Sequence, residues 1–84
     1  MPDGKTLIRQ LKEHVLSTMA GMPECARNSG AGAGWRLIEE IAGLELRLER
    51  QDGWLTWSLI VSLVNDGLVE VVPGTESRRK FRLR

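Results

Sequence analysis

Few side chains in this chain of 84 residues could carry covalent or acid–base chemistry. The chain contains one histidine, His14, and one cysteine, Cys25. A single cysteine cannot form an internal disulfide, and one cysteine with one histidine cannot assemble a structural zinc site. Neither residue has a neighbour in the sequence that would activate it as a nucleophile or a general base. We therefore expect that the protein is not an enzyme and that it binds no metal and no other cofactor.

A glycine-rich segment precedes the second predicted helix, with three glycines among residues 30–34. Glycines at a helix N-terminus let backbone N–H groups approach a phosphate. Here no strand pattern precedes the glycines and no Lys followed by Ser or Thr comes after them, which disfavours a nucleotide site. Because residues 23–34 also contain no large apolar side chain, we interpret them as a flexible connector in which Cys25 is exposed.

Basic residues are concentrated at the end of the chain. The formal net charge is +1, from 12 Lys and Arg against 11 Asp and Glu. Five of the basic residues lie within residues 78–84, which contain no acidic residue. The rest of the chain therefore carries seven basic against eleven acidic side chains, a net −4. An acidic body with a basic end predicts a polyanionic partner, and a merely solubilising terminus is the alternative.

Hydropathy and the first residues indicate where the protein is found. No apolar run approaches the roughly 18 residues that a membrane-spanning helix needs. Residues 1–4 lack the basic and apolar regions of a signal peptide. The composition, 42% apolar and 27% charged, is typical of a globular domain. We expect a cytoplasmic protein with no membrane partner.

Hydrophobic periodicity predicts three helices, which span about residues 4–20, 35–43 and 54–66. Asp3 and Asp52 are the expected N-caps of the first and third helices. Gly21 is expected to end the first helix in a left-handed conformation. Residues 44–50 alternate apolar and charged side chains as a strand would, yet they also continue a helical stripe. We favour an extension of the second helix there, because these residue types are strong helix formers.

The third helix is apolar over an arc of about 200°, which leaves Ser58, Ser62 and Asn65 as a narrow polar strip. Two β-rich segments, residues 68–72 and 80–83, follow it and predict a hairpin, with Pro73-Gly74 in a type II turn. The helical stripes and the hairpin predict one shared core, formed by Leu11, Val15, Ile41, Leu59, Leu63, Leu68 and Phe81.

Three helices followed by a hairpin with a long basic loop resemble the winged-helix variant of the helix-turn-helix. The resemblance is carried by residues 58–74, where the third helix closes with Asp66 before Gly67-Leu68-Val69, and by the basic residues within 78–83. It implies a mainly α fold with a C-terminal β-hairpin. Residues 1–84 would form a single winged-helix domain with a basic wing and tail over about 73–84.

In winged-helix proteins the third helix enters the major groove of DNA and the wing contacts phosphates. The resemblance therefore implies a nucleic-acid-binding protein, a small prokaryotic or phage transcriptional regulator. The groove-facing residues would be Thr56, Ser58, Ser62 and Asn65, and the wing residues would be Arg78, Arg79, Lys80 and Arg82. Residues 54–66 contain no Lys or Arg, so bidentate contacts of Arg to guanine are missing and most of the affinity would be independent of sequence.

The alternative is a winged helix that acts as a protein-interaction or dimerisation adaptor without sequence-specific DNA binding. Trp54 and Trp57, with Val61 one turn further on, place a large amphipathic surface on the third helix. We expect a two-fold homodimer through this surface, because the wide apolar arc would otherwise remain uncovered. The competing interpretation is that these tryptophans belong to the core of the monomer.

Overall fold

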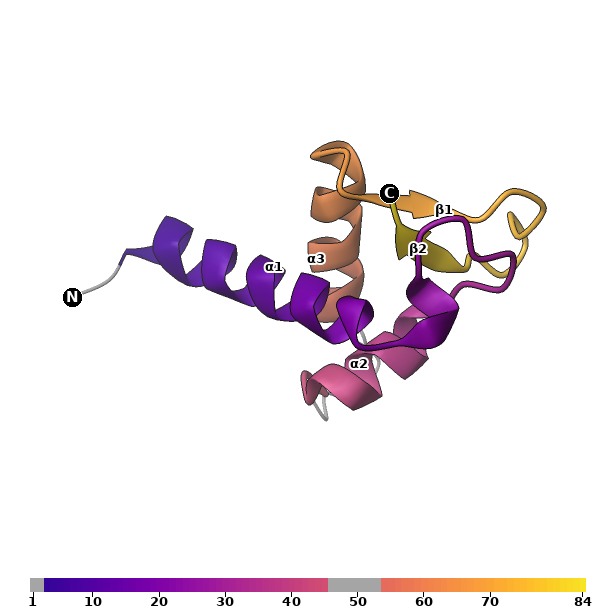
Figure 1. Cartoon of the computed structure of the whole chain (residues 1–84). Coiled ribbons are helices and arrows are strands. Elements are labelled where there is room, and N and C mark those ends of the chain that lie inside the picture. The colour runs from indigo at the N-terminus through magenta and orange to yellow at the C-terminus, as the bar shows by residue number, and fades with distance from the viewer. Residues whose placement is uncertain (1–2, 46–53) are drawn as a thin grey trace.

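The computed structural model describes residues 3–45 and 54–84. Its elements, in chain order, are helix α1 (Gly4–Ala20), the 3-10 turn η1 (Pro23–Cys25), helices α2 (Trp35–Ala42) and α3 (Trp54–Asn65), and strands β1 (Val69–Val71) and β2 (Phe81–Leu83). The strands pair antiparallel, and the hairpin packs beside α3 (Figure 1). The prediction of a mainly helical chain with a C-terminal β-hairpin is confirmed.

The ends of the helices differ from the sequence-based expectations in two places. Asp3 caps α1 as predicted: its carboxylate accepts a hydrogen bond of 2.8 Å from the Thr6 amide, which lowers the pKa of Asp3. Gly21, however, has right-handed angles, φ −86° and ψ −2°, so the predicted left-handed cap is wrong. Met22 follows in an extended conformation, and η1 begins at the next residue.

Helix α2 ends where a left-handed residue interrupts it. Gly43 has φ 70° and ψ 29°, and its amide donates to the carbonyls of Glu39 and Glu40. Residues 44 and 45 are not helical, so the predicted extension of this helix is wrong there, because a glycine cap overrides the helix propensity of the residues that follow. Residues 46–50, and Asp52 as a cap, lie outside the described residues.

The glycine-rich connector is anchored to the hairpin. Ala33 and Phe81 exchange two backbone hydrogen bonds, of 3.0 and 2.8 Å, so Ala33 forms an antiparallel bridge beside β2. Gly32 makes this approach possible: its φ is 67°, and a Cβ there would lie 2.6 Å from Cγ2 of Val72. Cys25 is fully buried in η1. The expectation that nothing anchors this segment is therefore wrong, since backbone pairing and small buried side chains hold it.

The core lies between the second half of α1, the inner sides of α2 and α3, and the hairpin. Its largest fully buried apolar side chains are those of Phe81, Met19, Ile38, Ile60, Leu63, Val15 and Val69. The predicted core residues Ile41 and Leu68 are instead 53% and 47% exposed. Neighbours facing the other way take their places: Ile38 and Ala42 cover the inner side of α2, and Val69 faces the core in place of Leu68.

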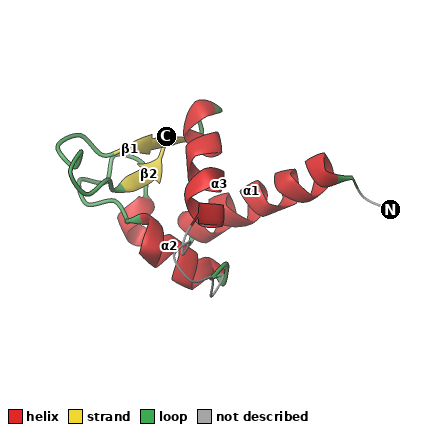
Figure 2. Ribbon diagram, turned by 180° about the vertical axis from the view of Figure 1, so that it is seen from behind, coloured by secondary structure: helices red, strands yellow, loops and turns green. Residues whose placement is uncertain are grey.

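The remaining predicted core residues agree with the structure. Val15, Leu59, Leu63 and Phe81 are buried together, and Leu11 packs against their edge while partly exposed. Seen from behind, α1 extends from this core away from the hairpin (Figure 2). Across residues 3–45 and 54–84, the structure has no helix that is both long and apolar enough to cross a lipid bilayer.

Candidate functional site

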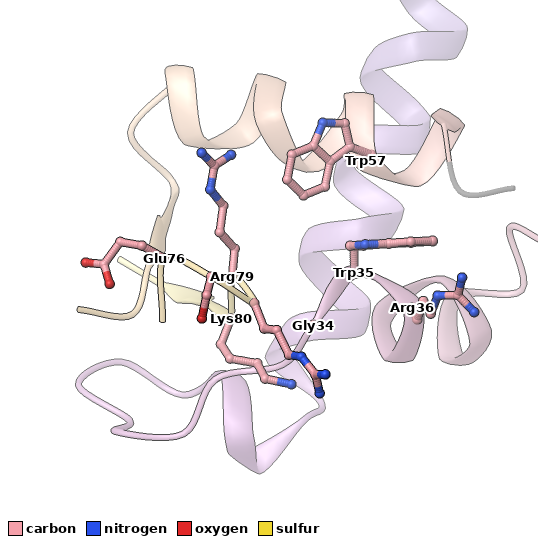
Figure 3. Close-up of a pocket in the computed structure, with 9 residues that line it drawn as sticks. Gly34, Trp35, Arg36, Trp57, Glu76, Arg79 and Lys80 are labelled. Atoms are coloured by element: carbon pink, nitrogen blue, oxygen red, sulfur yellow. The ribbon is translucent and has the colours of Figure 1, made fainter. Parts of the chain in front are cut away.

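A pocket of about 590 Å³ lies between the loop that precedes β2 and the first turn of α2 (Figure 3). We call it the wing pocket, and it is lined by Gly34, Trp35, Arg36, Trp57, Glu76, Ser77, Arg78, Arg79 and Lys80. In Figure 3 Arg79 and Lys80 lie on one side of the pocket and the two tryptophans on the other, while the Glu76 side chain extends away from it. The Arg79 side chain extends toward α3 and Trp57, whereas Lys80 extends toward Gly34. Three segments far apart in the sequence thus build one concave surface.

The wing pocket is strongly positive. It is lined by four cationic side chains and one carboxylate, that of Glu76. The carboxylate turns back to its own loop, where it accepts a hydrogen bond of 3.3 Å from the Gly74 amide. In the described part of the chain, the ion pairs are Lys12 with Asp66 and Arg82 with Glu70. None of the four cations of the pocket is therefore neutralised by a described carboxylate, and the pocket attracts anions.

Two cation–π contacts organise the aromatic side of the pocket. The Arg79 guanidinium lies 5.7 Å from the centroid of the Trp57 ring, and the Arg36 guanidinium lies 5.1 Å from that of Trp35. Trp57 also contacts Phe81 edge to face, with ring centroids 5.9 Å apart. The core residue Phe81 therefore holds one edge of Trp57, while its other side faces the pocket.

Thr75 fixes the loop that carries the cations. Its hydroxyl donates to the Val72 carbonyl at 2.7 Å and accepts from the Lys80 amide at 3.1 Å, so it closes the neck of the loop. Gly74 has φ 86°, as the third residue of a type II turn requires, and the Thr75 amide donates to the Val72 carbonyl. Sequence reasoning missed Thr75. The available signal was a Thr directly after Pro-Gly, where a hydroxyl can bond back to the turn.

Arg82 does not join the other basic residues. Its Nη1 donates to the Ser29 carbonyl at 2.7 Å, and its Nε lies 3.4 Å from Oε1 of Glu70 on the paired strand. Its side chain is only 16% exposed. Arg82 therefore lies apart from the cations of the wing pocket and ties the connector to the hairpin, while its predicted contact to nucleic acid stays a prediction.

The outer face of α3 adjoins the wing pocket. Trp57, Ser58, Val61, Ser62 and Asn65 line a second, shallower hollow of about 320 Å³, which we call the α3 groove. Trp57 thus borders both hollows. Ser58 and Asn65 are exposed as predicted, and Ser62 is partly exposed.

One residue predicted for this outer face lies inside the protein. Thr56 is fully buried among apolar side chains, so the prediction that it faces a groove is wrong. It precedes Leu59, Ile60 and Leu63 at helical spacing, which places it on the buried side of α3. The sequence does not reveal that Thr56 is buried, because threonine is polar in its hydroxyl, while its methyl group is compatible with a core position.

The two residues whose side chains could carry acid–base or nucleophilic chemistry, His14 and Cys25, both make structural contacts. His14 donates from Nε2 to the Ala42 carbonyl at 2.7 Å, and so bonds a carbonyl at the end of α2. Burial, with a smaller contribution from the charge of Glu24, raises the pKa of Cys25 to about 11. The expectation of an exposed thiol is wrong, since Cys25 lies in the core. The described residues contain no group of three His, Cys, Asp or Glu side chains placed to hold a metal ion.

The structure therefore brings Arg78, Arg79 and Lys80 together with Trp57, and with Trp35 and Arg36 from the start of α2. Their convergence depends on how α2 is placed against the hairpin, which no local pattern encodes. Trp54 and Val61 are 48% and 37% exposed on the outer side of α3. Comparison with known proteins gives no match to this chain, whether among family models, curated proteins or solved structures.

Proposed function

We propose that this chain is a nucleic-acid-binding protein of the winged-helix type. Its basic loop binds the phosphate backbone, and the outer face of α3 contacts the same nucleic-acid strand. A role in transcription regulation is part of this proposal. The observation that carries it is the position of Trp57, which lines both the cationic wing pocket and the α3 groove. The order of three helices and a hairpin supports the same assignment.

Charge placement supports contacts to phosphates rather than to base edges. The cations lie in the loop and at the start of α2, whereas α3 has no Lys or Arg. Ser58, Ser62 and Asn65 offer hydroxyl and amide groups, which bond phosphate and sugar oxygens as well as bases. The affinity would then come mostly from counterion release and fall steeply with salt.

The test compares two triple variants that remove equal charge. Arg78→Ser/Arg79→Ser/Lys80→Ser removes the cations of the loop, and Lys5→Ser/Arg9→Ser/Arg27→Ser removes three exposed cations elsewhere. Fluorescence anisotropy with short duplexes of unrelated sequence, titrated over a series of salt concentrations, measures affinity and its salt dependence.

The loop variant should bind every duplex more weakly, and the slope of log affinity against log salt should flatten by up to about three units. The matched variant should keep most of the wild-type affinity. Equal losses in both variants would mean that net charge alone attracts the nucleic acid, and that the loop is not the contact.

A second candidate function is self-association or the binding of another protein through α3. The observation in its favour is the exposure of Trp54 and Val61 on one side of that helix. Sedimentation equilibrium of the wild type and of Val61→Glu tests it. A dimer in the wild type that becomes a 9.4 kDa species in the variant would support this function. A wild type that is already monomeric would exclude the homodimer.

A further inference from the structure

We propose that the wing pocket binds an unpaired base together with its phosphate, so that the protein prefers nucleic acid with a single-stranded segment over a continuous duplex. This inference rests on the proposed nucleic-acid function and names the substrate class. The juxtaposition that carries it is that of two tryptophans and four cations around one pocket of about 590 Å³.

The aromatic side of the pocket suits the face of a base. Trp35 and Trp57 both line it, and each already has a guanidinium close to its ring. Aromatic rings and guanidinium planes are the groups on which unpaired bases stack in single-strand-binding proteins. A base inside a duplex has both faces covered by its neighbours, so these rings can reach only a base that has left the stack. A pocket of about 590 Å³ is within the usual range for small ligands.

The part of the pocket beside Gly34 suits a phosphate. Lys80 extends toward Gly34, and a Cβ at Gly34 would lie 3.6 Å from Nζ of Lys80. Gly34 is also the N-cap of α2, and no side chain caps that end of the helix. The amides of the first turn of α2 therefore point toward the same region as the Lys80 ammonium, and both favour an anion there.

The neighbouring α3 groove favours a strand over a free nucleotide. Trp57 borders both hollows, so a chain that places one base in the wing pocket can continue past Trp57 along Ser58 and Ser62. The groove is uncharged, and its lining combines the hydroxyls of Ser58 and Ser62 and the amide of Asn65 with the apolar surface of Trp57 and Val61, which suits sugars and bases. A free nucleoside monophosphate would leave it empty.

The experiment measures the affinity of the full chain for a blunt duplex and for the same duplex with a short thymidine overhang, at one salt concentration. We expect the wild type to bind the overhang duplex about fivefold more tightly or better, the gain of stacking a single base. Trp35→Leu should abolish this preference, and Trp35→Phe should retain most of it. Trp54→Leu is the matched control, since Trp54 is exposed on α3 outside the wing pocket.

Each outcome separates the two proposals. Binding of the blunt duplex that depends on Arg78, Arg79 and Lys80, without any preference for the overhang, would overturn the pocket inference and leave the proposed function standing. A preference that survives Trp35→Leu would also overturn the inference. Binding of neither duplex would overturn the proposed function, and the inference with it. Thymidine monophosphate that binds as tightly as the overhang duplex would contradict the strand as the occupant.

A folding control keeps the test decisive. Trp35 packs partly against the core, so circular dichroism must show that Trp35→Leu is folded. If it is not, Arg36→Glu replaces it, because Arg36 is exposed at the rim of the pocket. That variant should lose the preference for the overhang while its melting temperature stays close to that of the wild type. Retention of the preference in a folded Arg36→Glu protein would contradict the inference.

Discussion

The base of the hairpin and the loop that joins its strands place similar basic residues in opposite environments. At the base, Phe81 is buried, and Arg82 donates a hydrogen bond to the Ser29 carbonyl and forms an ion pair with Glu70. In the loop, Arg78 and Arg79 are exposed, and the Arg79 guanidinium lies over the ring of Trp57. Adjacent residues of a strand face opposite sides of the hairpin, and a residue in a strand also has partners on the paired strand. A cation in the strand can therefore be paired within the fold, whereas cations in the loop stay free to bind a ligand. A run of basic residues is therefore not one functional unit.

The largest effect is expected at the base. Phe81→Ala removes the ring that contacts Trp57 and fills the space between the hairpin and the helices. Truncation of a buried phenylalanine lowers the free energy of unfolding by about 3–5 kcal/mol, a large share of the stability of a small domain. Urea denaturation measures this change. Arg78→Ala in the loop is the comparison and should shift stability by less than about 0.5 kcal/mol. Similar losses in the two variants would contradict the division between base and loop.

The attachment of the connector to the base gives the second effect. Gly32→Ala places a Cβ 2.6 Å from Cγ2 of Val72 and 2.8 Å from Cβ of Lys80, at a φ of 67°. We expect a loss of more than about 1 kcal/mol in the free energy of unfolding. Gly30→Ala is the matched control, since a Cβ there meets nothing within 4 Å. Thermal melts of both variants measure the difference. If Gly32→Ala and Gly30→Ala have the same melting temperature, the bridge between Ala33 and Phe81 does not persist in solution.

The third effect separates the two kinds of arginine directly. Arg82→Met removes a hydrogen bond to the Ser29 carbonyl and the pairing with Glu70, so we expect a loss of about 1–2 kcal/mol in stability and little change in nucleic-acid affinity. Arg79→Met should do the reverse, with a stability change below about 1 kcal/mol, the usual size of an exposed cation–π contact. Denaturation and anisotropy on the same two proteins supply both readouts. Loss of affinity in Arg82→Met at unchanged stability would return Arg82 to the candidate interface.

The helices and the hairpin were predictable from the sequence. The three helices follow from apolar spacing, and the hairpin follows from β-rich segments around Pro73-Gly74. The connector was not predictable, because its anchor is backbone pairing at Ala33 and a buried thiol, and neither leaves a hydrophobic pattern. Ile41 and Leu68 were misplaced for another reason. For Ile41, an apolar stripe identifies the side of a helix, and for Leu68 a β-rich segment identifies a strand, but which apolar residue is covered depends on the neighbours that pack there.

The candidate site was predictable only in part. Arg78, Arg79 and Lys80 follow from charge clustering, and Ser58 and Asn65 follow from the polar strip of α3. Sequence reasoning could not separate Arg82 from these cations, because its partners are set by strand register and by the path of the connector. The meeting of the loop with the start of α2 is likewise a tertiary feature. Nearest-neighbour patterns carry no information on it.

The smallest effect is expected at Cys25, which is buried in the core as Phe81 is. Its thiol has a pKa raised to about 11, mainly by burial and further by the charge of Glu24. Thiolate is the reactive form, so alkylation of the native protein near neutral pH should be far slower than alkylation in denaturant. Labelling at the same rate under both conditions would show that η1 does not hold Cys25 in the core.

The same raised pKa fixes the sign of a pH dependence. An unfolded cysteine ionises with a pKa of about 8.5, so between that pH and about 11 the unfolded chain binds fewer protons at this site than the folded protein does. The free energy of unfolding must therefore fall as the pH rises through this window, and the contribution of Cys25 is fully present below it. Cys25→Ala removes this term while other groups titrate as before. Urea denaturation at successive pH values measures the free energy of unfolding of both proteins. As the pH rises, the free energy of unfolding of the wild type should fall relative to that of Cys25→Ala. A difference independent of pH would mean that the native thiol ionises as freely as the unfolded one.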